Sequence, residues 1–77
     1  MNNSQQMLEA LEQQDLSKAE SFFQKALDED SDEVLLELAA YLEGIGFYPQ
    51  AAQIYEKLAP KFPEVYINLA AIAGEDG

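Results

Sequence analysis

Apolar residues recur at gaps of three and four along most of the chain, which is the spacing of one face of an α-helix. The clearest run begins at Leu16 and continues through Ala19, Phe23 and Ala26. Nowhere do apolar and polar residues alternate as they would in a half-buried strand. The pattern therefore predicts an all-α fold of about five helices joined by very short turns.

Aspartate, glycine and proline mark the predicted breaks between the helices. Asp15 is a favourable N-cap for the second helix, and Pro49 suits the first turn of the fourth. The third helix opens near Asp30 or Ser31, and Asp30 with Glu33 has the form of a capping box. We therefore expect turns near residues 14–15, 29–31, 44–48 and 60–63, and a further turn at residues 74–77.

Two segments of the chain repeat each other at a distance of 31 residues, from Glu33 to Glu64. Residues 33–42 and 64–73 are identical at five of ten positions. The other helix of each period repeats as well: Phe23 and Tyr55, both aromatic, lie 32 residues apart. A period of about 30–35 residues, with two helices in each period, is typical of a helical solenoid.

One period of the chain resembles the tetratricopeptide repeat. The matching positions carry large apolar, small and aromatic residues in the order of that repeat, followed by a closing proline: Leu35, Leu38, Ala39, Leu42, Tyr48, Ala51, Tyr55, Leu58 and Pro63. The resemblance implies a right-handed superhelix of stacked antiparallel helix pairs in one domain. Residues 1–31 would form a poorly matching first repeat, 32–63 the best-matching second, and 64–77 the first helix of an incomplete third. The chain would then be an N-terminal fragment of a longer protein of this type.

Residue size has a physical explanation in such a stack. Small residues let paired helices cross closely, and we expect this of Ala39, Ala51 and Ala70. Aromatic residues fill the space between one pair and the next, and we expect this of Phe23, Tyr48 and Tyr55.

Charge narrows the range of partners. Fifteen acidic residues, four lysines and no arginine give a formal net charge of −11. Binding to phosphate groups needs clustered lysine and arginine, so the charge argues against nucleic acid and against an anionic membrane surface. No secretory signal and no membrane-spanning run is present. We expect a cytoplasmic protein whose charge serves solubility or, alternatively, attracts a basic partner.

The residue types present also limit the chemistry. The chain contains neither histidine nor cysteine, so it lacks the commonest general base, the commonest metal ligand and the thiol nucleophile. The acidic run at residues 28–33 lacks the central glycine of a calcium-binding hand loop. A turn between helices with an acidic N-cap explains the same residues. We therefore expect no catalytic, metal or cofactor site and no enzymatic activity.

In tetratricopeptide arrays, the first helix of each pair lines a concave groove that receives a peptide or helix. By that resemblance, the groove positions here would be Glu33, Leu36, Glu37, Ala40, Ile67, Asn68 and Ala71. Gln5, Glu9 and Glu12 would extend the groove if the first helix is in register. Leu36 and Ile67 are apolar outside the core positions of the repeat, so they either pack against a neighbouring element or form an apolar strip in the groove. The resemblance implies a protein–protein interaction adaptor or scaffold whose ligand is an apolar or basic peptide or helix.

The last predicted helix is apolar nearly all round, with Asn68 as the single polar interruption between Val65 and Ala73. A helix of this kind is normally buried on more than one face. We therefore expect either a further helix in the natural protein or a homo-oligomer in which two chains cover each other. The alternative function is accordingly structural: an N-terminal cap and oligomerisation segment of a longer repeat protein, with no groove ligand of its own.

Overall fold

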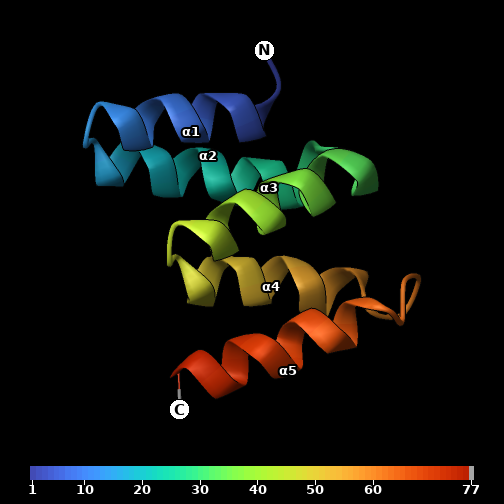
Figure 1. Cartoon of the computed structure of the whole chain (residues 1–77). Coiled ribbons are helices and arrows are strands. Elements are labelled where there is room, and N and C mark those ends of the chain that lie inside the picture. The colour runs from blue at the N-terminus through green and yellow to red at the C-terminus, as the bar shows by residue number, and fades with distance from the viewer. Residues whose placement is uncertain (77) are drawn as a thin grey trace. The chain divides into compact units, whose positions relative to one another are not determined.

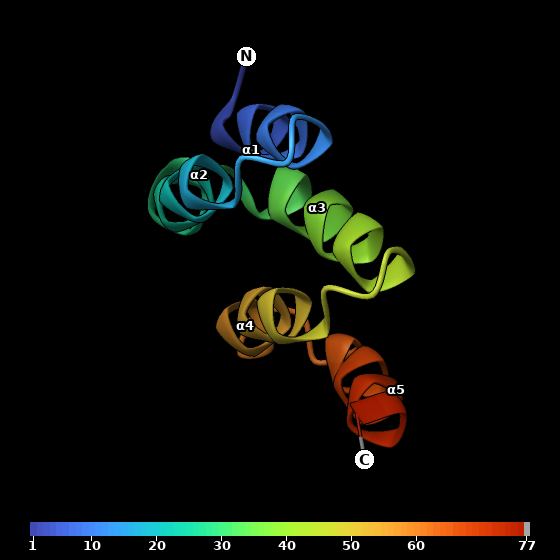
Figure 2. The same cartoon turned by 90° about the vertical axis from the view of Figure 1, so that its left-hand side faces the viewer.

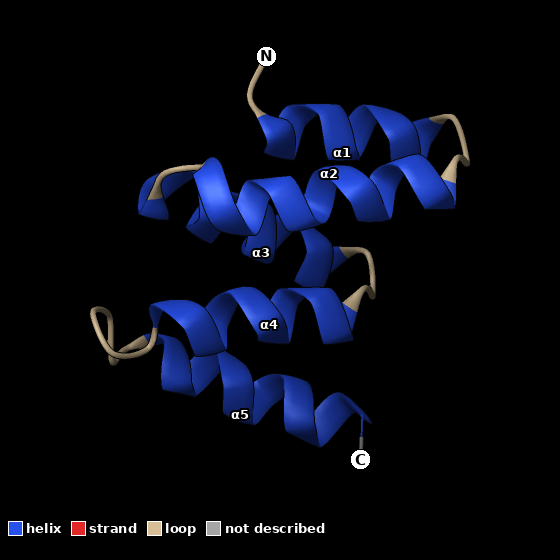
Figure 3. Ribbon diagram, turned by 180° about the vertical axis from the view of Figure 1, so that it is seen from behind, coloured by secondary structure: helices blue, strands red, loops and turns tan. Residues whose placement is uncertain are grey.

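The computed structural model describes residues 1–76, which form five α-helices joined by short loops (Figure 1). The helices are α1 (Asn3–Glu12), α2 (Leu16–Glu29), α3 (Asp32–Gly44), α4 (Tyr48–Leu58) and α5 (Val65–Asp76). They contain 78% of the chain, and no strand occurs among residues 1–76 (Figure 3). The prediction of an all-α fold is confirmed. The backbone forms two compact units, Met1–Leu35 and Leu36–Gly77, whose boundary lies within α3.

The first unit is built on α1 and α2, two antiparallel helices that lie side by side (Figures 1 and 2). The Asn2 side chain accepts a hydrogen bond from the Gln5 backbone N–H at 2.8 Å, and the Gln5 side chain accepts from the Asn2 N–H at 3.1 Å. This reciprocal pair is a capping box that begins α1. Asp15 caps α2, as predicted, by accepting from the Lys18 N–H at 3.0 Å. Between the two helices the chain reverses at Gln14, whose φ of 60° is left-handed.

The core of the first unit follows the apolar spacing of the sequence except at Leu16, the first residue of the predicted run, which is 66% exposed. Met7 and Ala10 are buried on α1, and Ala19, Phe23 and Ala26 are buried on α2. Phe23 is fully buried, and burying a side chain of this size typically stabilises a fold by about 1.5–3 kcal/mol. The alanines let the two helices approach closely.

Asp30 connects the end of α2 to the start of α1. Its Oδ2 accepts from the Ser4 backbone N–H at 2.8 Å and from the Ser4 Oγ at 2.7 Å. Its Oδ1 accepts from the Asn3 Nδ2 at 3.1 Å and from the Asn3 backbone N–H at 3.4 Å. Burial raises the pKa of Asp30, but these hydrogen bonds outweigh burial and hold the pKa below its ordinary value of 3.8.

Of the two starting points expected for α3, Asp30 and Ser31, the structure uses Ser31. Ser31 Oγ accepts from the Val34 N–H at 3.3 Å, so serine caps this helix. The backbone N–H of Asp30 instead donates to the Ala26 carbonyl at 3.0 Å, where α2 ends. The predicted capping box of Asp30 with Glu33 is therefore wrong, because the Asp30 carboxylate is engaged by the first turn of α1.

The second unit contains the larger part of α3 together with α4 and α5, and α4 and α5 are antiparallel neighbours (Figure 2). The chain leaves α3 through Gly46, whose φ of 89° is the left-handed conformation that favours glycine. Pro49 stands in the first turn of α4, as predicted. The predicted breaks near residues 14–15, 29–31, 44–48 and 60–63 all coincide with loops.

The core of the second unit combines aliphatic side chains with small ones. Leu42, Ile54 and Leu58 are among its largest buried side chains. Ala39 and Ala51 are fully buried, as expected for positions of close helix approach. Ala70 is exposed, however, so the same expectation is wrong there. The buried line of α5 passes through Val65 and Ile72, and Ala70 lies about 140° around the helix from Val65.

Helix α5 buries one face within this chain and leaves the rest exposed. Tyr66 is 60% exposed and Ile67 is 76% exposed. The helix also continues through Gly74 to Asp76, so the turn predicted at residues 74–77 is wrong as far as the structure describes it, and Gly77 lies outside the described residues. A glycine in a helix costs roughly 1 kcal/mol relative to alanine, which does not by itself end the helix.

Candidate functional site

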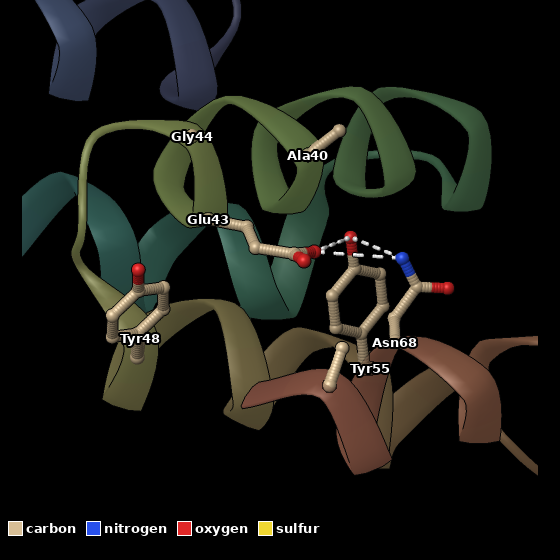
Figure 4. Close-up of a pocket in the computed structure, with 7 residues that line it drawn as sticks. Ala40, Glu43, Gly44, Tyr48, Tyr55 and Asn68 are labelled. Carbon is tan, nitrogen blue, oxygen red and sulfur yellow. Dashed lines mark hydrogen bonds between the residues drawn. The ribbon is translucent and has the colours of Figure 1, made fainter. Parts of the chain in front are cut away.

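Three helices of the second unit surround an open pocket of about 450 Å³ (Figure 4). A volume of this size lies within the range of roughly 300–1,000 Å³ that is typical of ligand sites. The residues that line it come from α3, α4 and α5: Ala40, Glu43, Gly44, Tyr48, Tyr55, Asn68 and Ala71.

A hydrogen-bonded triplet of side chains stands at the centre of the pocket. Glu43 extends from α3 toward Tyr55 of α4 and Asn68 of α5 (Figure 4). Tyr55 Oη donates to Glu43 Oε1 at 3.0 Å, and Asn68 Nδ2 donates to the same oxygen at 3.4 Å. A longer contact of 3.5 Å joins Asn68 Nδ2 to Tyr55 Oη. The triplet therefore links one polar group from each of the three helices.

The environment of Tyr55 raises the pKa of its phenol. Burial, the hydrogen bond to Glu43 and the negative charge of Glu43 together raise the pKa of Tyr55 to about 12. A tyrosine carries its proton at neutral pH in any case, and the raised pKa keeps the phenol a hydrogen-bond donor to the carboxylate into alkaline solution. Tyr55 is also 3% exposed, which confirms the expectation that it belongs to the core.

Helix geometry brings the lining residues to one place. Ala40, Glu43 and Gly44 are three and four positions apart on α3, so they share one face of that helix. Asn68 and Ala71 are likewise three positions apart on α5. A Cβ atom added at Gly44 would meet no atom within 4 Å, so the pocket is open on this side. Small residues on α3 and α5 thus leave room around the carboxylate.

Three of the groove residues predicted from the sequence, Ala40, Asn68 and Ala71, line this pocket. Ala40 and Ala71 are exposed, and Asn68 is half-buried within the triplet. The structure therefore brings these three positions of α3 and α5 together at one surface. Their role in binding a partner stays a prediction.

The other predicted groove residues do not line the pocket. Leu36 is half-buried, Glu37 is exposed and Ile67 is 76% exposed, all in the second unit. Glu33 is exposed and belongs to the first unit, as do the exposed residues that would have extended the groove, Gln5, Glu9 and Glu12. Their participation in one groove likewise stays a prediction.

Sequence reasoning missed the acidic centre of the pocket. Glu43 follows Ala40 by three residues, so continuing the predicted groove face of α3 by one more turn would have reached it. Tyr48 and Tyr55 were assigned to packing between helix pairs. Tyr55 does pack in the core, yet its hydroxyl also faces the pocket. The spacing of apolar positions predicts that a tyrosine is buried, but it does not predict where the hydroxyl of that tyrosine points.

The pocket offers one carboxylate, one phenol and one amide. Among residues 1–74, whose side chains the structure describes, no group of three or more acidic side chains lies close enough to hold a metal ion, and the sequence contains no histidine or cysteine. Of the seven lining residues, Glu43 alone is charged at neutral pH. The arrangement can therefore accept hydrogen bonds from a donor and attract positive charge.

Comparisons of the chain with protein-family models, with curated proteins and with solved structures find no match. The resemblance to tetratricopeptide repeats, including the stacking of helix pairs into a superhelix, therefore stays a prediction. Within the described part of the chain, every helix is too short or too polar to cross a membrane.

Proposed function

We propose that this chain is a cytoplasmic protein–protein interaction module of tetratricopeptide type, an adaptor or scaffold that binds an apolar or basic peptide or helix and catalyses no reaction. The observation that carries the proposal is the surface of the second unit. There an exposed apolar side chain, Ile67, lies four positions before Ala71 of the acidic pocket, so the two residues share one face of α5.

Exposed apolar side chains gather on α5. Tyr66 and Ile67 are 60% and 76% exposed, and Ala71 is exposed beside the pocket. Covering exposed apolar surface removes it from water and so favours association. Tyrosine is also among the residues that most often dominate binding energy at interfaces. These side chains favour a partner with an apolar face of its own.

The charge selects among such partners. The chain carries a net charge of −11, and α3 presents the exposed carboxylates of Glu33 and Glu37. Opposite charge accelerates encounter and disfavours partners of like charge. A basic peptide with an apolar face is thus favoured over an acidic one.

The proposal is tested with a panel of labelled helical peptides that share one apolar face and differ in charge. Fluorescence anisotropy should show tighter binding of basic than of acidic peptides, and the preference should weaken as salt shortens the screening length to about 8 Å or less. Ile67→Gln should weaken binding. Leu16→Gln, at an exposed leucine of the first unit, is the matched control. A preference for acidic peptides would contradict the proposal.

The exposed face of α5 also supports the structural alternative, in which this chain is a cap and oligomerisation segment. Two copies that cover Tyr66 and Ile67 on each other would bring together two chains of net charge −11. Self-association should therefore strengthen as added salt screens the repulsion, whereas binding of a basic peptide should weaken. Light scattering over a salt series separates the two functions by the sign of this dependence.

A further inference from the structure

We propose that the pocket around Glu43, Tyr55 and Asn68 binds one basic side chain, the ammonium of lysine or the guanidinium of arginine, presented by a partner peptide. The inference rests on the proposed interaction function and names the group that this surface recognises. Four features of the pocket support it: acceptor capacity, preorganisation, room and charge.

The carboxylate of Glu43 retains acceptor capacity after its contacts within the protein. Both Tyr55 Oη and Asn68 Nδ2 donate to the same oxygen, Oε1. Among the described residues, no donor reaches the other oxygen, Oε2. An ionised carboxylate offers about four acceptor positions. A donor that enters the pocket can therefore bind Glu43 without displacing the existing hydrogen bonds.

The triplet holds the carboxylate in place before any ligand arrives. Tyr55 is 3% exposed and its phenol is protonated, so Glu43 accepts from a donor that is buried and does not ionise near neutral pH. A preorganised acceptor loses little conformational entropy on binding. Glu43 also stands in the last turn of α3, where the negative end of the helix dipole adds to its own charge. Both effects favour a cation at this point.

The walls of the pocket suit the remainder of a basic side chain. Ala40 and Gly44 leave room beside the carboxylate, and the aliphatic stems of lysine and arginine pack well on small apolar surface. Tyr48 lines the same pocket with an aromatic ring, and such rings attract cations. No lysine is among the lining residues, so the pocket has no positive charge to attract an acidic side chain.

The experiment is an NMR titration of the full chain with capped single amino acids. The probes are N-acetyl-lysine methylamide, N-acetyl-arginine methylamide and, as neutral and acidic controls, the corresponding citrulline and glutamate compounds. The readouts are the side-chain amide of Asn68 and the backbone amide of Gly44. We expect saturable shifts with at least one cation, in the millimolar range typical of a single contact, and the two cationic arms identify which side chain fits. Equal shifts with citrulline, or none with either cation, would overturn the proposal.

Matched variants identify the group responsible. Glu43→Gln keeps an oxygen acceptor for Tyr55 but removes the charge, and it should weaken cation binding by about tenfold or more. Glu56→Gln makes the same change of charge at an exposed position of α4 outside the pocket, and it should stay within about twofold of the parent. Unchanged binding by Glu43→Gln, with its fold confirmed by circular dichroism, would overturn the assignment.

A second pair of variants tests the room in the pocket. Ala40→Phe should fill the space beside Glu43 and abolish the shifts, whereas Ala70→Phe adds the same ring at an exposed position of α5 outside the pocket and should leave them. Retained binding by a folded Ala40→Phe would count against the site.

Failure of this inference is distinguishable from failure of the interaction function. Basic peptides that bind the parent and Glu43→Gln equally well would overturn the pocket while leaving the interaction function intact. Saturable cation shifts in a chain that binds none of the helical peptides would support the pocket and contradict the broader function.

Discussion

Replacing Tyr55 by alanine tests how strongly the second unit depends on one side chain. Tyr55 is 3% exposed, and its hydroxyl donates to Glu43 at 3.0 Å. Truncation of a large buried aromatic residue costs about 3–5 kcal/mol, from lost burial and from the cavity left behind. A chain of this size has a total unfolding free energy on the order of 4–12 kcal/mol, at about 0.05–0.15 kcal/mol per residue. Tyr55→Ala should therefore remove a large share of the stability.

Tyr55→Phe separates the contribution of the ring from that of the hydroxyl. The phenylalanine ring keeps the burial but cannot donate to Glu43. A hydrogen bond to a charged group is worth about 1.5–3 kcal/mol, and because Glu43 is half-buried and can turn to water, we expect a loss near the lower figure. Tyr41→Phe is the matched control, since Tyr41 is 47% exposed and its change should stay within about 0.5 kcal/mol.

Urea unfolding followed by far-ultraviolet circular dichroism measures these losses. Amide hydrogen exchange in the second unit provides a second readout, because a chain with two compact units need not unfold in one step. A Tyr55→Ala variant within about 1 kcal/mol of the parent would show that the ring is not part of the core. A Tyr55→Phe variant equal to Tyr41→Phe would show that the hydrogen bond to Glu43 adds nothing to stability.

Three further perturbations have definite expected signs. Asp30→Asn should lower the free energy of unfolding by about 1–2 kcal/mol near neutral pH. Because the folded-state pKa of Asp30 lies below 3.8, its contribution to stability is present above pH 3.8 and is lost as the pH falls through the lowered pKa. The difference in urea stability between parent and variant should therefore shrink in acid, and a difference that stays constant would contradict this prediction. Gln14 and Gly46 both adopt the left-handed conformation, which costs an ordinary residue about 1–2 kcal/mol. Gln14→Gly should therefore stabilise the fold by up to about 1 kcal/mol, and Gly46→Ala should destabilise it by a similar amount. A Gln14→Gly variant that melts below the parent, or a Gly46→Ala variant that melts above it, would refute this. An absorbance titration should show one tyrosine with a pKa of about 12. In Glu43→Gln this pKa should move toward 10.0, whereas an unchanged pKa would show that Glu43 does not contribute to the shift.

Much of the fold was predictable from the sequence because the local signals agree with one another. The apolar spacing of α2 and the proline of α4 each specify a helix without reference to distant residues. The cap of α3 was not predictable in the same way. Asp30 and Ser31 are both good N-cap residues, and the choice between them depends on Ser4, 26 positions earlier in the chain.

The candidate site shows the same division. Ala40, Asn68 and Ala71 were named because the resemblance to the tetratricopeptide repeat assigns these positions of the first helix of each pair to the groove. Glu43 was not found because its significance depends on Tyr55, 12 positions along the chain, and on Asn68, 25 positions along. Ala70 was misplaced for a related reason. Its repeat counterpart Ala39 is buried, but burial depends on what packs against a helix, which the repeat does not specify.

The attachment of α1 to Asp30 has a consequence for how the chain withstands trimming. The first backbone N–H groups of a helix usually face water, and chain ends are where fraying and proteolysis concentrate. In α1 the N–H groups of Asn3 and Ser4 are bonded to Asp30, and that of Gln5 is bonded to Asn2. Unwinding the first turn of α1 must therefore also break its hydrogen bonds to Asp30 at the C-terminal end of α2. An aminopeptidase should therefore stall after the exposed Met1, and removing the carboxylate of Asp30 should let digestion continue into the helix.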